Sequence, residues 1–252
     1  MLENTTSGLN VNRTGETLLD IRNLNVAYGK AQVIKNANLT VNAGEFVALL
    51  GRNGAGKSTL LHAACSLIPK LSGSVFFIGK EITNSSPQEI VQSSLIQVLE
   101  GHRVFQNLSV EDNLLIGTYS KNHNGDRSRL DNIYELFPEL KDHKLKLGSQ
   151  LSGGQQQILA VAQGVIAEPK LLILDEPSSG LAPIVIDRIL SVASSLCKQG
   201  IAILLVEQLV DKALKHANYV YLLEAGEVVA HGGADEMRNS EMIKNVYLGG
   251  SH

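Results

Sequence analysis

The stretch Gly51-Arg-Asn-Gly-Ala-Gly-Lys-Ser-Thr59 decides the fold of this chain. It matches the phosphate-loop pattern, which is a glycine, four residues, then Gly-Lys followed by Ser or Thr. The apolar run Glu45-Phe-Val-Ala-Leu-Leu50 before it predicts a buried strand, and Leu60-Leu-His-Ala-Ala-Cys65 after it predicts the start of a helix. Such a turn directs backbone N–H groups toward an anion, and the helix N-terminus adds positive potential. An ordinary glycine loop is the alternative, which the flanking strand and helix disfavour.

The loop therefore predicts a site for ATP and Mg²⁺. Lys57 is expected to reach the β- and γ-phosphates, and Ser58 is expected to offer its hydroxyl to Mg²⁺. The nucleotide-binding residues predicted within the loop are Gly51, Arg52, Asn53, Gly54, Ala55, Gly56, Lys57, Ser58 and Thr59.

The composition is that of an ordinary soluble protein, and the length suits one large α/β domain or a core domain with a smaller subdomain. The chain has 252 residues, of which 44% are hydrophobic and 19% are charged. A formal net charge of -3 gives no electrostatic reason to expect a nucleic-acid partner. No apolar run approaches the ~20 residues that span a bilayer, so membrane association is expected through a partner. The N-terminus does not match a secretory signal. Cys65 and Cys197 are isolated and are expected to be buried thiols in a reducing cytosol.

A second motif, Lys170-Leu-Leu-Ile-Leu-Asp175-Glu176-Pro177, predicts a buried strand that ends in two carboxylates. Apolar strands that alternate with helices indicate a parallel sheet, and ligands bind at the carboxyl ends of such strands. Asp175 is therefore expected to share an edge with the phosphate loop and to hold Mg²⁺ through its water shell. Glu176 is placed to orient or deprotonate an attacking water. Two unrelated surface carboxylates are the alternative, which the phosphate loop disfavours.

Between residues 101 and 150 the chain loses glycines and gains charges, and its helical patterns predict an inserted helical subdomain. Ser109 is expected to cap the first of these helices, with Asp112 three residues later. The subdomain is interpreted as a partner surface, and a solvated helical lid is the alternative. Residues 1–16 are polar and without periodicity, which predicts a flexible tail. Ser152, before two glycines and a helical run, is interpreted as a plain helix cap from spacing alone.

Three motifs occur in one order: the phosphate loop, Leu151-Ser-Gly-Gly-Gln155, and Leu171-Leu-Ile-Leu-Asp-Glu-Pro177. Together they resemble the ATP-binding subunits of ABC transporters, over residues 17–252. The motif Leu151-Ser-Gly-Gly-Gln155 is far more specific to that family than the phosphate loop. The resemblance implies an α/β fold: a P-loop NTPase core with a mostly parallel sheet, an N-terminal antiparallel β subdomain and a helical subdomain at about 101–150.

Other stretches resemble one subgroup, the branched-chain amino acid importers, and the smaller of its two ATPase types. They are Val98-Leu-Glu-Gly-His-Arg-Val-Phe-Gln-Asn-Leu-Ser-Val-Glu-Asp-Asn-Leu114, Tyr134-Glu-Leu-Phe-Pro138, Pro177-Ser-Ser-Gly-Leu-Ala-Pro183, Val206-Glu-Gln208 and Tyr247-Leu-Gly-Gly250. The resemblance implies an ATPase that lies peripherally on the cytoplasmic face of the inner (plasma) membrane. It would bind transmembrane permease subunits and a second ATP-binding subunit, in a homodimer or a heterodimer.

The resemblance also assigns residue roles. Tyr28 would stack on adenine, although its spacing alone favours a strand-end tyrosine packed on the sheet. Glu100 stands where most such ATPases carry a glutamine that touches Mg²⁺ and links to the membrane subunit. Ser152, Gly153 and Gly154 would contact a γ-phosphate held by the opposite subunit, so that two ATP molecules lie between two subunits.

Some positions depart from the general family pattern. Gln208 replaces the usual histidine; its amide can donate to a γ-phosphate but does not titrate near neutral pH. Ala182 replaces an aspartate, and both changes fit the importer subgroup, as Glu100 does. No role is inferred for the other departures, which are Gln163, His102 and Leu99.

Three alternatives remain open from the sequence, and one of them, a nucleotide sensor without turnover, is disfavoured by Glu176. The same type of ATPase subunit could power another ABC transporter, for an amide, urea or a lipid-linked substrate. A non-transport ABC protein of translation or DNA repair is the second alternative, but such proteins usually carry two ATPase units or a long coiled coil, and this sequence shows neither.

Overall fold

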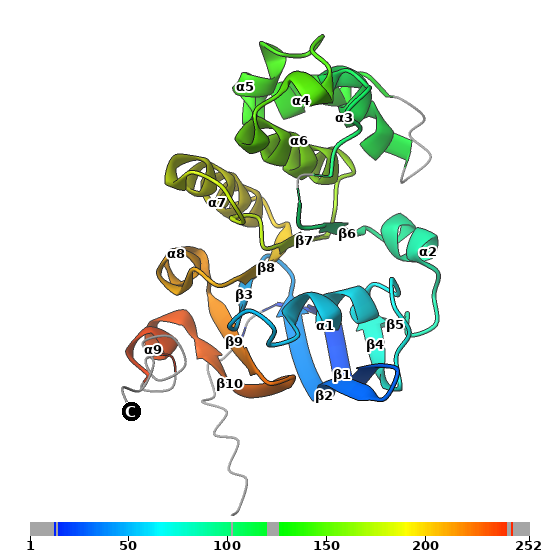
Figure 1. The fold of residues 1–252 in the computed structure, drawn as a ribbon, viewed down its shortest axis with the longest axis vertical. Helices are drawn as coiled ribbons and strands as arrows, with labels where there is room; N and C mark the ends of the chain where they lie inside the picture. Colours follow the sequence, from blue (N-terminus) through cyan, green and yellow to red (C-terminus); the bar gives the residue numbers. More distant parts are fainter. Residues whose placement is uncertain (1–12, 14, 102, 120–125, 241–242, 244–252) are drawn as a thin grey trace, which may run out of the picture.

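The computed structural model describes residues 13, 15–101, 103–119, 126–240 and 243. Within them, β3 (Phe46–Leu50) lies inside a six-stranded sheet of order β10-β9-β3-β8-β7-β6 (Figure 1). The strands from β9 to β6 run parallel, and β10 pairs antiparallel with β9, which confirms the predicted mostly parallel sheet. The other strands are β6 (Leu95–Val98), β7 (Leu171–Asp175), β8 (Ala202–Glu207), β9 (Tyr219–Glu224) and β10 (Glu227–Gly233).

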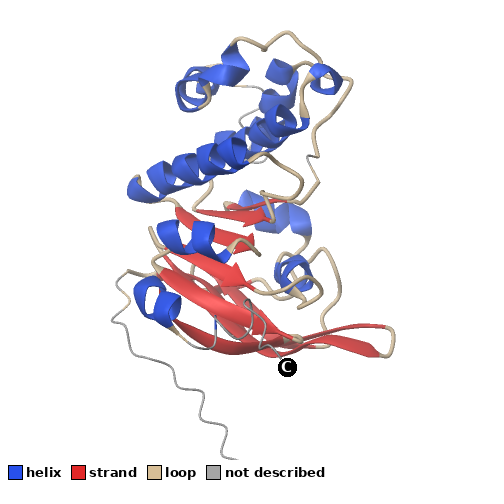
Figure 2. Ribbon diagram, turned by 60° about the vertical axis from the view of Figure 1, so that its left-hand side comes forward, coloured by secondary structure: helices blue, strands red, loops and turns tan. Residues whose placement is uncertain are grey.

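A second, antiparallel sheet has the order β2-β1-β4-β5 and packs beside the first, as Figure 2 shows. Its strands are β1 (Thr17–Tyr28), β2 (Ala31–Asn42), β4 (Ser72–Phe77) and β5 (Lys80–Glu81). Helix α1 (Lys57–Ala64) joins the two sheets in one apolar cluster, because its Leu60 and Leu61 are fully buried there. The expected antiparallel β subdomain therefore packs against helix α1.

The remaining helices cover the six-stranded sheet or lie beyond its edge. In Figure 1, α3 to α6 gather above the sheet, and α7 to α9 lie along its side. Their bounds are α2 (Pro87–Gln92), α3 (Val110–Thr118), α4 (Arg129–Leu136), α5 (Pro138–Lys141), α6 (Gly153–Ile166), α7 (Pro183–Lys198), α8 (Val210–His216) and α9 (Ala234–Asn239), with a 3₁₀ turn η2 at Gly148–Gln150. The predicted cap at Ser109 is confirmed, because its hydroxyl oxygen accepts the Asp112 N–H. Among the described helices, none has the length and apolar character needed to cross a bilayer.

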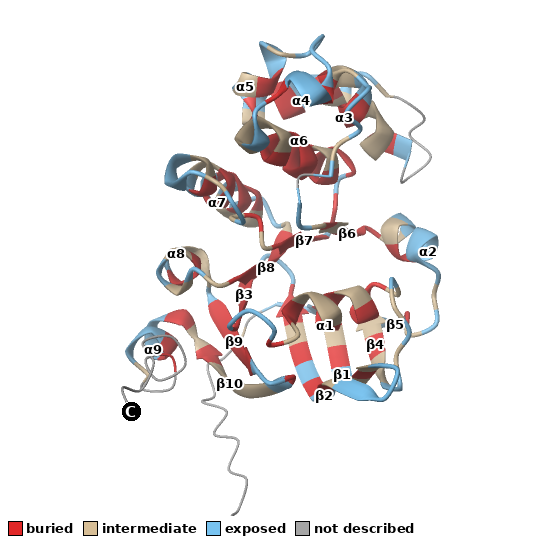
Figure 3. Ribbon diagram, viewed as in Figure 1, coloured by how far each residue is buried: buried red, intermediate tan, exposed pale blue. Residues whose placement is uncertain are grey.

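The strand before the phosphate loop is buried on both faces, which explains why its sequence is continuously apolar. Phe46, Ala48 and Leu50 belong to the core beneath the helices, whereas Val47 and Leu49 belong to the core between the sheets. Figure 3 shows this buried band through the middle of the molecule. The loop that follows β3 is therefore fixed to a rigid strand.

The predicted start of the helix after the phosphate loop differs from the structure. Helix α1 begins at Lys57, before the run 60–65 in which the sequence predicts the start of a helix, and it ends at Ala64. After this helix the chain turns at Ser66, which has a left-handed φ of 56°. Helix α9 ends at Asn239, and most later residues lie outside the described part.

Arg13 lies within the predicted tail but is held by the folded domain. Its guanidinium donates to Glu45 from Nε at 2.8 Å and lies over the Tyr219 ring, 4.2 Å from the centroid. Its Nη2 also donates to the Thr40 carbonyl at 2.8 Å. Residues 1–12 and 14 of the predicted tail lie outside the described residues.

Both cysteines are free thiols, in agreement with the sequence. Cys65 is fully enclosed in the core between the sheets, and burial raises its pKa to about 12. Cys197 is only half-buried and donates from Sγ to the Gly44 carbonyl at 3.2 Å.

Candidate functional site

The phosphate loop connects β3 to α1 and needs glycine at positions where backbone and side chains crowd it. A Cβ on Gly51 would lie 2.5 Å from the Leu223 carbonyl oxygen. A Cβ on Gly56 would lie 2.7 Å from Ile34 Cδ1, and its φ of +103° is rare for other residues. The first N–H groups of α1 have no acceptor within the helix and are available to an anion. The local structure is therefore the one that the motif predicted.

Lys57, the first residue of α1, is buried with 3% of its side chain exposed. Its Nζ donates to the carbonyl oxygens of Gly51 at 2.9 Å and Arg52 at 3.2 Å. It also forms an ion pair with Glu176 Oε1 at 2.9 Å. A buried ammonium is costly unless it is paired. In this structure, therefore, the Glu176 carboxylate stabilises the cation that the sequence assigned to the phosphates.

Asp175 ends β7 beside the loop and is 1% exposed. Ser58 Oγ donates to its Oδ1 at 3.0 Å, and Gln97 Nε2 donates to its Oδ2 at 3.4 Å. His62 Nε2 lies 3.6 Å from the same Oδ2. A carboxylate and a hydroxyl are the oxygen ligands that Mg²⁺ takes, together with substrate phosphates and water. Within the described part of the chain, no three His, Cys, Asp or Glu side chains gather into a metal site of their own.

The register of the sheet explains this meeting. Leu50, directly before the loop, pairs with Glu207, and Asp175 pairs with Val206 on the other side of β8. The carboxyl ends of β3, β8 and β7 therefore lie at one edge, as expected for adjacent parallel strands. Residues more than 100 positions apart thus share one site.

Gln208 reaches the same site from the end of β8. Its Nε2 donates to Glu176 Oε2 at 2.9 Å, so both oxygens of Glu176 are held. Glu176 also has a φ of +43°, a region that residues other than glycine rarely occupy and that is concentrated at functional sites. The geometry fits an amide that orients the glutamate, whichever role the glutamate has.

Glu207 is a site residue for which the sequence analysis inferred no role. It is 2% exposed, and its carboxylate accepts from Ser178 Oγ at 2.8 Å and from the N–H of Gln208 at 3.1 Å. Burial raises the pKa of Glu207, and these hydrogen bonds act in the opposite direction. Its carboxylate thus ties the turn after Glu176 to Gln208. Its position directly after an apolar strand that neighbours the phosphate-loop strand is the signal that could have identified it.

Other predicted site residues do not join this cluster within the described chain. Tyr28, at the end of β1, is 53% exposed rather than packed on the sheet. Glu100 lies in the exposed turn after β6, where its carbonyl accepts from Arg103 Nε at 3.1 Å. Ser152 caps α6 by accepting the Gln155 N–H at 3.3 Å, which confirms the cap. A Cβ on Gly153 would meet open space, whereas one on Gly154 would lie 3.0 Å from Val185 Cγ2.

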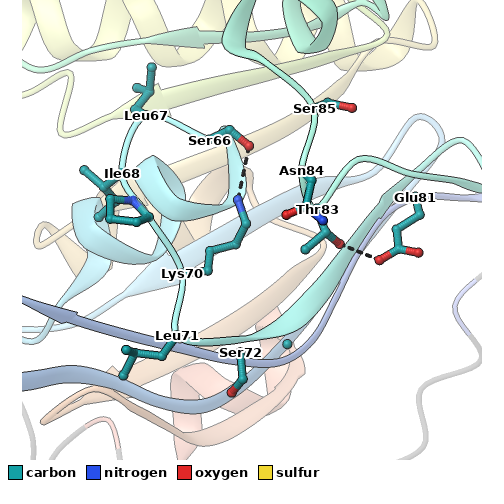
Figure 4. Close-up of a pocket in the computed structure, with 12 residues that line it drawn as sticks. Ser66, Leu67, Ile68, Lys70, Leu71, Ser72, Glu81, Thr83, Asn84 and Ser85 are labelled. Atoms are coloured by element: carbon teal, nitrogen blue, oxygen red, sulfur yellow. Dashed lines mark hydrogen bonds between the residues drawn. The ribbon is translucent and has the colours of Figure 1, made fainter.

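A cavity of about 700 Å³ lies away from all of these residues (Figure 4). It lies between the segment after α1 and the turn after β5. Lys70 donates to Ser66 on one side, and Thr83 donates to Glu81 on the other. None of the predicted nucleotide or metal residues lines it. We therefore place the candidate site at the phosphate loop and not in this cavity.

Comparisons with known proteins identify the family of this chain. The family described as ABC transporter matches residues 34–179, more than half of the chain. The chain is 39% identical over 233 residues to BraG, the high-affinity branched-chain amino acid transport ATP-binding protein of Pseudomonas aeruginosa, covering 92% of this chain and 100% of BraG. It is 31% identical over 233 residues to LptB, the lipopolysaccharide export system ATP-binding protein of Escherichia coli K12, covering 92% of this chain and 97% of LptB.

The fold is shared with solved structures as well. The ADP conformation of MJ1267, an ATP-binding cassette of an ABC transporter, superimposes with a TM-score of 0.82 at 24% identity, over 93% of this chain and 100% of that one. The motifs, the site geometry and the relatives lead to one conclusion: this chain belongs to the ABC transporter family, as an ATP-binding and ATP-hydrolysing subunit.

Proposed function

We propose that this chain hydrolyses ATP to power an importer of branched-chain amino acids, from the cytoplasmic face of the inner (plasma) membrane. The observation that carries the proposal is the cluster of Lys57, Asp175, Glu176 and Gln208 at one sheet edge. The 39% identity to BraG along its full length supports the choice of substrate class.

Binding of ATP would change the partners of Lys57. Among the described residues, its Nζ contacts the Glu176 carboxylate and the carbonyl oxygens of Gly51 and Arg52. A β- or γ-phosphate at the N-terminus of α1 would compete for this ammonium, because it offers a stronger anionic acceptor than a carbonyl. The ion pair would then open and leave the Glu176 carboxylate free to act.

Ser58 and Asp175 would hold Mg²⁺, and Glu100 is the third ligand implied by the resemblance. The buried Asp175 carboxylate and the Ser58 hydroxyl already lie in contact and fit the oxygen preference of the metal. When bound, Mg²⁺ would neutralise charge on the β- and γ-phosphates.

Glu176 would accept the proton of the attacking water, and Gln208 would hold the glutamate and donate its amide to the γ-phosphate. Because glutamine does not titrate, its contribution would not vary with pH near neutrality. Tyr28 is exposed at the end of β1, so its ring is free to stack on an adenine.

A second ATP-binding subunit would complete the site, as a copy of this chain or a related ATPase. Ser152, Gly153 and Gly154 form the N-terminus of the 14-residue helix α6, and Gly153 has open space beside it. No hydrogen bond joins these three residues to the phosphate loop of their own chain within the described part. Their N–H groups and the helix dipole would therefore stabilise a γ-phosphate on the opposite subunit.

An apolar surface on the helical subdomain would bind the permease subunits. We name it the 105–147 surface; it consists of Phe105, Leu108, Leu145 and Leu147, which are 53%, 37%, 81% and 40% exposed. Segments 105–108 and 145–147 lie side by side, because the Gly148 N–H donates to the Leu108 carbonyl at 2.9 Å. Exposed apolar side chains in one group mark interaction sites.

Uptake measurements test the proposal. Cells that lack the gene should lose high-affinity uptake of radiolabelled leucine, and the wild-type chain should restore it. The Glu176→Gln variant, expressed equally, should not restore it, and lysine uptake should be the same in all strains. Normal leucine uptake in the deletion strain would contradict the importer assignment. Restoration of uptake by Glu176→Gln would contradict the catalytic role of Glu176.

A second candidate is a transporter for a lipid-linked substrate, which the 31% identity to LptB favours. The same strains distinguish it. A deletion that leaves leucine uptake intact but weakens the outer-membrane permeability barrier would favour this candidate over the importer.

A further inference from the structure

We propose that Gln97 of β6 is a positioning residue for the metal carboxylate, and that its side-chain amide, rather than the Glu100 side chain, holds Asp175 in its metal-binding orientation. This inference rests on the proposed Mg²⁺ role of Asp175.

The sheet places Gln97 close to Asp175. Strand β6 is the edge strand beside β7, and Gln97 pairs directly with Ile173. Asp175 lies two residues further along β7, and residues i and i+2 of a strand face the same side of the sheet. A long side chain reaches such a diagonal neighbour. The Gln97 Nε2 thus comes within 3.4 Å of Asp175 Oδ2.

Gln97 is the one polar residue of β6, since Leu95, Ile96 and Val98 are all buried apolar residues. A glutamine in this position is unfavourable for packing unless its amide is hydrogen-bonded. Its Oε1 is buried and has no hydrogen-bond partner. An unsatisfied buried acceptor is unfavourable, and such groups in native proteins often have functional explanations. The amide is therefore expected to contribute more than packing.

Ser58 and Gln97 donate hydrogen bonds to different oxygens of the Asp175 carboxylate. Ser58 Oγ contacts Oδ1, on the phosphate-loop side, and Gln97 Nε2 contacts Oδ2. An amide on Oδ2 restrains the rotation of the carboxylate. Oδ1 then stays directed toward the Ser58 hydroxyl, which would also bind the metal. Being neutral, the amide does not compete with the cation for charge. Hydrogen bonds to metal-binding carboxylates act in this way, and their loss typically weakens metal affinity by about 10–100-fold.

Glu100 does not take this part in the structure. It lies in the exposed turn beyond the end of β6, where its backbone carbonyl accepts a hydrogen bond from Arg103 Nε. His62 approaches Asp175 Oδ2 only to 3.6 Å, which exceeds a hydrogen bond. In the described part of the chain, Gln97 thus supplies the side-chain amide that contacts the carboxylate.

The test measures metal binding rather than turnover. Mn²⁺ is titrated by electron paramagnetic resonance into the protein saturated with a non-hydrolysable ATP analogue. We expect Gln97→Leu to weaken Mn²⁺ affinity about tenfold or more, with unchanged affinity for the analogue in EDTA and an unchanged melting temperature. The matched control is Gln163→Leu, because Gln163 is also partly buried but donates its amide to the Asn113 carbonyl at 2.8 Å. Should Gln97→Leu not fold, Gln97→Met keeps the unbranched shape without the donor.

Two further variants separate the possible failures. If Asp175→Asn binds Mn²⁺ as the wild type does, the metal site proposed above is wrong, independently of Gln97. If Asp175→Asn loses affinity while Gln97→Leu stays within twofold of the wild type, the inference about Gln97 is overturned. Loss of Mn²⁺ affinity in Glu100→Gln but not in Gln97→Leu would assign the position to Glu100 instead.

Discussion

The ion pair between Lys57 and Glu176 makes one substitution especially informative. Glu176→Gln keeps the shape of the side chain but removes its charge, which lies 2.9 Å from the Lys57 ammonium. Lys57 is 3% exposed and Glu176 is 12% exposed, so water does not replace the lost partner well. The same change removes the proposed base for the attacking water. Three properties should therefore change together.

The free protein should become less stable. Removal of one partner from a buried ion pair costs about 3–5 kcal/mol, and the amide oxygen that remains as an acceptor should reduce this loss to about 2 kcal/mol. Nucleotide affinity should rise, because ATP no longer has to open the ion pair. If the whole ~2 kcal/mol is recovered on binding, affinity rises by up to about 30-fold. Hydrolysis should fall by about 10²–10⁴-fold, the usual contribution of a general base.

Three assays check these expectations: urea unfolding without nucleotide, titration of an ATP analogue in EDTA, and single-turnover hydrolysis of labelled ATP. The matched control is Glu224→Gln, an exposed glutamate at the end of β9, which should change none of the three. Hydrolysis within tenfold of the wild type would refute the assignment of Glu176 as the base. Unchanged stability together with unchanged affinity would refute the argument that ATP competes with Glu176 for Lys57.

Three further predictions follow from individual contacts. Gln208→Ala removes the 2.9 Å bond to Glu176 and should lower kcat about 10–100-fold, the effect of losing a hydrogen bond to a charged group; Gln208→His should restore part of the rate, with a pH dependence near 6.5 that the wild type lacks. Arg13→Ala should destabilise the domain by about 3 kcal/mol in urea unfolding, and it should be largely non-additive with Glu45→Gln because the two side chains are paired. Burial raises the Cys65 pKa to about 12, so the contribution of the buried thiol to folding stability is complete below the unfolded pKa of about 8.5 and is lost as pH rises toward 12. Mass spectrometry should find native Cys65 unmodified by iodoacetamide at pH 8. Rapid alkylation at that pH would contradict the burial of this thiol.

The cluster at the sheet edge could be predicted because its residues belong to contiguous motifs. Lys57 and Ser58 follow the glycine loop, and Asp175 and Glu176 end an apolar strand, so local patterns place each pair. Parallel strands then bring the two motifs to one edge. Gln208 was predicted from the resemblance, and its contact with Glu176 is present, although its proposed role toward a γ-phosphate is still a prediction.

Contacts between segments that are far apart in the sequence were harder to predict. Gln97 reaches Asp175 only because β6 is the strand beside β7, and no local pattern around Gln97 indicates this neighbour. Arg13 was predicted to belong to a flexible tail because its surroundings are polar and lack periodicity. Its partners, Glu45, Thr40 and Tyr219, lie 27 to more than 200 residues away along the chain.

The sequence by itself determined the phosphate loop, the strand and helix that flank it, the two carboxylates and the family resemblance. These features depend on short-range chemistry: glycines that permit a turn, apolar periodicity, and residue types suited to phosphate and metal. Only the tertiary structure decided which groups hold the side chains that are proposed to act in catalysis. Lys57 is paired with Glu176, and Asp175 is held between Ser58 and Gln97. Such pairings depend on strand order and register, which place groups within hydrogen-bond distance whatever their separation in sequence.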